Sequence, residues 1–189
     1  GIEHAEITVA SPIQVTGESA LAGIYYSLEQ NGASVSTESK ELAQEELNAL
    51  SDINDENQNK EGYDADKLNV AMTDIKSAVA DGGSSLSESD IRKIVEDTLS
   101  NYGLKDSMTS NQITVIVNFA VNLSKSSVIK NSIFKSTLTS LKNSIVSKAK
   151  STFSGINLNF DANSAIESGK GFFANLWQQI VNFFTNLFS

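Results

Sequence analysis

The last eighteen residues of the chain, Phe172–Ser189, combine six aromatic side chains with no charged one. On an α-helix at about 100° per residue, the apolar side chains fill an arc of roughly 200°, and amide and hydroxyl side chains fill the rest. Burial of one large apolar side chain is worth about 1.5–3 kcal/mol, so such a helix needs something to cover its apolar face. This requirement constrains both the fold and the interactions of the protein.

Three partners could cover this apolar face: the protein's own core, a second copy of the chain, or a membrane surface. Trp and Phe suit the headgroup depth of a membrane, but surface-seeking helices usually carry Lys or Arg on the polar face, and this segment has none. The pattern therefore favours packing or self-association over a membrane. The side chains expected to contact a membrane or a partner are Phe172, Phe173, Trp177, Ile180, Phe184 and Phe188.

The charged side chains are divided unevenly along the chain. Residues 1–103 hold twenty acids and six bases, whereas residues 104–160 hold seven lysines and one acid, within a net charge of −9. This division predicts a dipolar molecule with one basic side, although lysines that merely solvate a helix give the same pattern. The lysines expected to contact an anionic membrane surface or a cell-wall polymer are Lys130, Lys135, Lys142, Lys148 and Lys150. No nucleic acid is expected, because no arginine lies among these lysines and only one aromatic residue, Phe134, does, which is too few for base stacking.

The N-terminal stretch His4–Ala10 alternates polar and apolar side chains and is followed by Ser11 and Pro12. This pattern predicts a half-buried β-strand. One strand cannot pair its own backbone donors and acceptors. We therefore expect residues 1–16 to be a strand and connector that belong to a missing N-terminal α/β region, and the strand to be a second site of possible self-association.

The rest of the sequence has helical periodicity, and predicts a mainly α fold: an irregular bundle of about six to seven helices. The expected helices run from 17 to about 31, from 36 or 37 to about 51, from 64 to 82, from 87 to 103, from 109 or 110 onward, and from about 128 to 153. A polar loop is expected over 52–63. The helix after Thr109 is apolar nearly all round, which predicts that it is the central buried helix. We expect the bundle to occupy residues 17–160, and the C-terminal amphipathic helix to occupy residues 161–189.

Composition argues against an enzyme. The chain has no cysteine and one histidine, so a Cys–His or Ser–His–Asp site and a zinc site are not expected. Oxygen ligands from Asp55 to Asp66 have some spacing of a calcium loop, but Lys60 stands where that loop needs glycine. A solvated acidic face is the better interpretation, and we expect no cofactor and no metal.

Several motifs resemble the DUF1002 family, whose members are secreted proteins of Gram-positive bacteria. The similar segments are Ile7–Pro12, Val15–Ile24, the Glu-rich Ala43–Leu47, and the aromatic ending from Phe172 to Phe184. In the family, a region of mixed strands and helices precedes the equivalent of Ile7. The resemblance implies an extracellular or cell-surface location, and it assigns no catalytic residue. We expect a secreted or cell-envelope interaction protein without catalysis; the alternative is a peripheral membrane-binding or membrane-perturbing protein that acts through the C-terminal helix.

Overall fold

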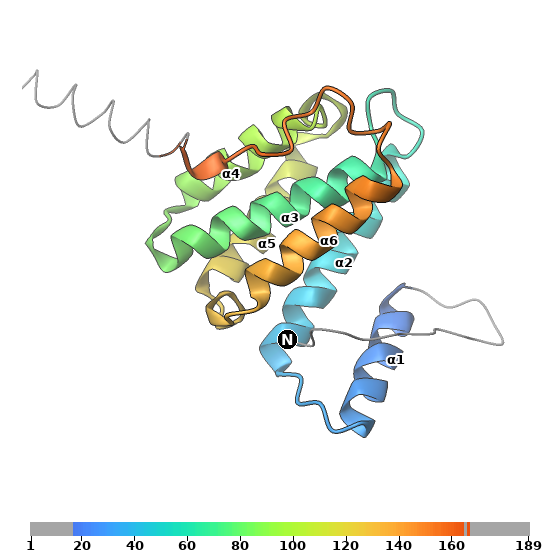
Figure 1. Cartoon of the computed structure of the whole chain (residues 1–189), viewed down its shortest axis with the longest axis vertical. Helices are drawn as coiled ribbons and strands as arrows, with labels where there is room; N and C mark the ends of the chain where they lie inside the picture. The colour runs from blue at the N-terminus through green and yellow to red at the C-terminus, as the bar shows by residue number, and fades with distance from the viewer. Residues whose placement is uncertain (1–16, 165, 167–189) are drawn as a thin grey trace, which may run out of the picture.

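The computed structural model describes residues 17–164 and 166. These residues form a bundle of helices and contain no β-strand, which confirms the predicted mainly α fold (Figure 1). The α-helices are α1 (Gly17–Gln30), α2 (Thr37–Asn57), α3 (Ala65–Gly82), α4 (Glu88–Asn101), α5 (Ser110–Lys125) and α6 (Phe134–Lys148). Short 3-10 helices follow three of them: η1 (Gly83–Ser85), η2 (Lys105–Ser107) and η3 (Val128–Lys130).

Two of the predicted segments fall where the structure gives no description. The strand expected within residues 1–16 lies outside the described residues, so the structure gives that expectation no support. The aromatic segment 172–188 also lies outside them. Within the part of the chain that is described, no helix is both long and apolar enough to cross a membrane.

Helices α2, α3, α4 and α5 start where the sequence predicts them, because short polar side chains cap them. Asp64 accepts a hydrogen bond from the backbone N–H of Lys67, at 3.0 Å, at the start of α3. Ser87 and Asp90 bond to each other's backbone N–H at the start of α4, which is the predicted capping box. At the other end of α4, Gly103 takes a positive φ of 67° and ends the helix.

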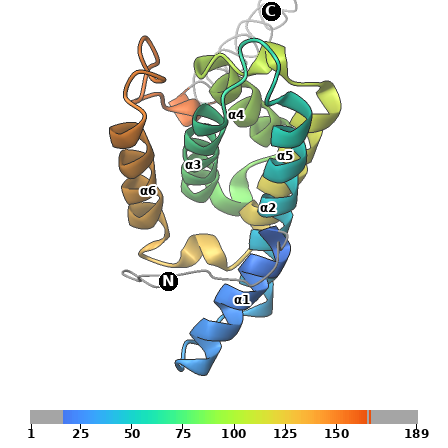
Figure 2. The same cartoon turned by 90° about the vertical axis from the view of Figure 1, so that its right-hand side faces the viewer.

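The centre of the bundle is α3 rather than the helix that the sequence predicts. Residues 70–73 of α3 are all buried, and α3 packs against α4, α5 and α6. Figure 2 shows α6 and α5 on opposite sides of it. The prediction of α5 as the central helix is wrong, because α5 exposes one stripe: Asn111, Val115, Asn118 and Asn122. These residues recur every three or four positions, so they share one face of the helix, and that face is exposed to solvent.

The polar loop predicted over 52–63 is also wrong in part, because α2 continues to Asn57. Ile53 and Asn57, one turn apart, are 2% and 0% exposed. Burial of this face against the bundle outweighs the low helix propensity of the Asp- and Asn-rich sequence. With Asp55 inside a helix, the twelve-residue calcium loop does not form.

The predicted helix over 128–153 is divided into η3 and the shorter α6. Between them the side-chain oxygen of Asn131 accepts a hydrogen bond from the backbone N–H of Ile133, at 3.1 Å. Such a local bond competes with the helical one and interrupts the helix. After α6 the chain folds back on the bundle, where Phe153, Ala162 and Ile166 join the core.

α1 stands apart from this core. It packs mainly against α2, and none of its side chains from Leu21 to Gln30 is fully buried. Both views place α1 at one end of the molecule and the chain after α6 at the other (Figures 1 and 2).

Candidate functional site

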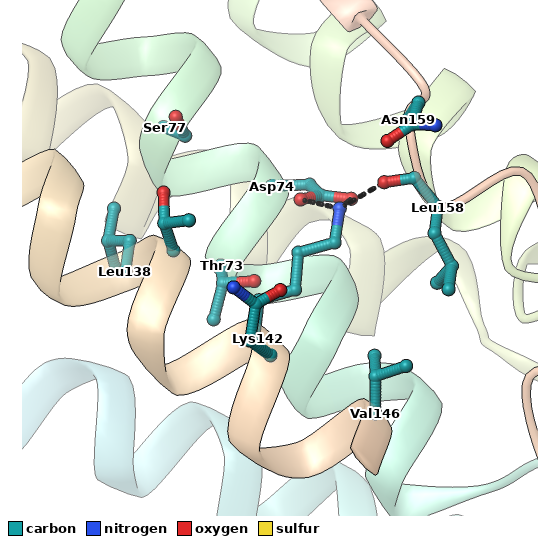
Figure 3. Close-up of a pocket in the computed structure, with 10 residues that line it drawn as sticks. Thr73, Asp74, Ser77, Leu138, Lys142, Val146, Leu158 and Asn159 are labelled. Atoms are coloured by element: carbon teal, nitrogen blue, oxygen red, sulfur yellow. Dashed lines mark hydrogen bonds and ion pairs between the residues drawn. The ribbon is translucent and has the colours of Figure 1, made fainter. Parts of the chain in front are cut away.

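A pocket of about 450 Å³ lies between α3 and α6 and is bordered by residues 158 and 159 after α6 (Figure 3). Its lining combines hydroxyl, amide, charged and aliphatic side chains: Thr73, Asp74, Ser77, Leu138, Thr139, Lys142, Asn143, Val146, Leu158 and Asn159. The volume falls within the range of roughly 300–1,000 Å³ that is usual for small-molecule sites.

An ion pair between Lys142 and Asp74 lies in this pocket. The Lys142 Nζ is 2.7 Å from Oδ1 and 2.9 Å from Oδ2 of Asp74, and it also donates to the backbone oxygen of Leu158 at 2.5 Å. The side chains of Lys142 and Asp74 are only 18% and 14% exposed. The ammonium group therefore bonds at the same time to the Asp74 carboxylate and to a backbone oxygen beyond α6. Lys142 therefore joins α6, α3 and the returning chain.

Tyr102, which follows α4, completes the cluster from inside the core. Its hydroxyl donates a hydrogen bond of 2.6 Å to Oδ2 of Asp74. The ring, 1% exposed, meets Phe153 edge to face, with centroids 6.5 Å apart. Burial raises the pKa of Tyr102 far above its usual range, and the hydrogen bond to Asp74 and the charge of Asp74 raise it further. The hydroxyl is therefore a hydrogen-bond donor and remains protonated at neutral pH.

The structure does not bring the five predicted lysines together as one set. Lys142 points into the pocket, and Lys135 forms an ion pair with Asp81 of α3. Lys130 lies in η3 at one end of α6, while Lys148 and Lys150 are exposed at its other end. Anion contact at these lysines remains a prediction, as does partner contact through Phe172, Phe173, Trp177, Ile180, Phe184 and Phe188, which lie outside the described residues.

Sequence reasoning missed Asp74 and Tyr102. One signal for Asp74 was available: it is an acidic residue in a predicted helix, and most of the residues around it in the sequence are apolar. A charged side chain at such a place usually has a partner of opposite charge. Nothing local in the sequence identifies that partner as Lys142, which is 68 residues away.

The arrangement offers little for catalysis. The charges of Asp74 and Lys142 neutralise each other, and Tyr102 is held in its protonated form. Among the described residues, no group of three His, Cys, Asp or Glu side chains is placed to hold a metal ion. The cluster has the features of a structural joint beside a polar pocket.

The described residues thus form a mainly α bundle in which α6 and the returning chain are attached to α3 by a shielded ion pair. The chain belongs to the DUF1002 family of proteins of unknown function, whose model matches residues 1–141. Asp74 and Tyr102 lie inside the matched region, whereas Lys142 and Leu158 lie beyond it. No curated protein and no solved structure matches the chain.

Proposed function

We propose that this protein is a non-enzymatic interaction module, secreted or held in the cell envelope, that uses the helical bundle as a platform for its C-terminal aromatic segment, residues 172–188. One observation carries the proposal. Among the described residues, the large apolar side chains that are strongly exposed are Tyr26, Val115 and Leu141, and they lie on three different helices. Scattered side chains of this kind do not form a continuous apolar strip on the bundle. The ten large apolar side chains of residues 172–188 would need such a strip to pack on, so we infer that another molecule covers them.

The chemistry of the pocket supports a role without catalysis. Its only cation and its only carboxylate are bonded to each other, and the buried Tyr102 bonds to the same carboxylate. The likeness of the chain to secreted DUF1002 proteins, together with the absence of cysteine from the sequence, supports the proposed location.

The only tryptophan of the chain, Trp177, lies in the aromatic segment and makes the proposal testable by fluorescence. The experiment uses the full chain, vesicles of anionic and of neutral lipid, and sedimentation velocity to follow self-association. We expect the full chain to bind vesicles or to associate with itself, and the Trp177 emission to shift to the blue when it does. Vesicle binding would identify a membrane surface as the partner, and association without lipid would identify a second copy.

Two paired variants locate the contact. Phe184→Ser with Phe188→Ser removes apolar side chains and should abolish the association, whereas Asn182→Ser with Asn186→Ser changes only the polar face and should preserve it. An emission that is already blue in the monomer without lipid, with a large loss of thermal stability in the Phe variant, would place the segment in the core and overturn the proposal.

A further inference from the structure

We propose that the pocket between α3 and α6 binds a small, neutral, hydroxyl-rich ligand of sugar type. The proposal concerns described residues only and does not rest on the proposed function of the aromatic segment. The inference rests on the charge state of the pocket, on the polar groups left without partners along its wall, and on its size.

The pocket contains charged side chains but no free charge. The Lys142 ammonium is bonded to both carboxylate oxygens of Asp74 and to the backbone oxygen of Leu158, so its positive charge is already paired. An anionic ligand would either lie beside the Asp74 carboxylate, which repels it, or displace that carboxylate and leave it largely buried without a counter-charge. A cationic ligand meets the same difficulty, because Lys142 already neutralises Asp74. The pocket therefore selects against both signs of charge.

Several polar groups on the wall are free to bond to a ligand. The side chains of Ser77, Asn143 and Asn159 make no hydrogen bond to any other described residue. Oδ1 of Asp74 accepts only from Lys142 and retains one acceptor position, while Oδ2 accepts from both Lys142 and Tyr102. Ser77 and Asp74 stand on α3, and Asn159 stands across the pocket from them (Figure 3).

These groups fit hydroxyls better than other neutral chemistry. Asp74 offers only an acceptor, whereas each of the three free side chains offers both a donor and an acceptor. A hydroxyl group both donates and accepts a hydrogen bond at one oxygen. Neighbouring hydroxyls on one ligand can therefore bond to donors and acceptors that lie close together on the pocket wall. Leu138, Val146 and Leu158 supply aliphatic surface for the C–H faces of a ring.

The test uses three probes with the same hexose ring and different charge: glucose, glucuronate and glucosamine. Amide chemical shifts of the full-length protein are followed by NMR in titrations at millimolar concentrations. We expect saturable shifts with glucose at residues that line the pocket, and at least about fivefold weaker binding of both charged probes.

Asn143→Ala removes one free amide and should weaken glucose binding about fivefold to tenfold. Asn111→Ala, on the exposed stripe of α5, is the matched control and should leave it unchanged. The proposal is overturned if glucose gives no saturable shift, if either charged probe binds as tightly as glucose, or if the two variants behave alike. These readouts are shifts and variants of described residues, whereas the interaction-module proposal is tested through Trp177, Phe184 and Phe188, so the two failures are distinguishable.

Discussion

Tyr102 is the largest of the fully buried side chains in the described part of the chain, and its hydroxyl still finds a partner in Asp74. A buried hydroxyl without a partner would be destabilising, so the position of Asp74 on α3 is what allows tyrosine there. Asp74 in turn needs Lys142. These three residues come from three parts of the chain. Lys142 allows Asp74 to be buried, and Asp74 allows the hydroxyl of Tyr102 to be buried.

The raised pKa of Tyr102 predicts a fall in stability at high pH. The folded protein holds the hydroxyl proton more tightly than the unfolded chain, so the contribution is complete below the unfolded pKa of about 10 and is lost as the pH rises above it. The free energy of unfolding should fall by at most about 1.4 kcal/mol per pH unit from this one group. Urea unfolding at a series of pH values measures it.

Tyr102→Phe should cost about 1–2 kcal/mol at neutral pH, since Asp74 loses a donor, and should make the high-pH fall shallower. Tyr26→Phe is the control, because Tyr26 is 66% exposed. Equal pH dependence in both variants would contradict the assignment.

At the scale of the helices, one polar network attaches the end of α2 to the start of α5. Oε1 of Gln112 accepts from the backbone N–H of Thr109 at 2.8 Å and from the amide of Asn57 at 3.0 Å. Its Nε2 donates to Glu56 at 2.7 Å. Gln112 thus caps its own helix and also satisfies Asn57, which is fully buried in the bundle.

Gln112→Ala should therefore lower the free energy of unfolding by about 2 kcal/mol, because the variant loses one of the two bonds of the capping box and leaves the buried Nδ2 of Asn57 without its acceptor. The neighbouring variant Asn111→Ala lies on the exposed face of the same helix and should change the value by less than about 0.5 kcal/mol. Chemical denaturation of the two variants checks this, and similar losses would argue against the network.

Helix starts could be predicted from the sequence because a cap involves residues three apart. Ser36, Asp64, Ser87 and Thr109 cap at the predicted positions. The end of α2 could not be predicted in the same way. Residues 52–57 have the composition of a loop, and they are helical because Ile53 and Asn57 are buried against residues that are distant in sequence.

At the scale of the whole molecule, burial is concentrated around α3 and is low in α1. Stability should follow the same distribution, because a segment with few buried contacts opens without unfolding the rest. α1 packs mainly on α2, whereas α3 is enclosed by three helices.

Native-state hydrogen exchange should therefore show fast exchange of α1 amides by local opening. The amides of α3 around Val70–Ile75 should exchange slowest, at the rate of global unfolding. Similar protection of the two helices would mean that α1 is part of the cooperative core.

Taken by itself, the sequence determined the mainly α class, the four helix starts that a side chain caps, and the membership of the chain in its family. Those features depend on local periodicity, on caps within one turn, and on residue patterns that a short window contains. Only the tertiary structure decided that α3, not α5, is central, and that Lys142 is shielded against Asp74. Both depend on side chains far apart in sequence, whose burial is set by the partner that folding brings to them.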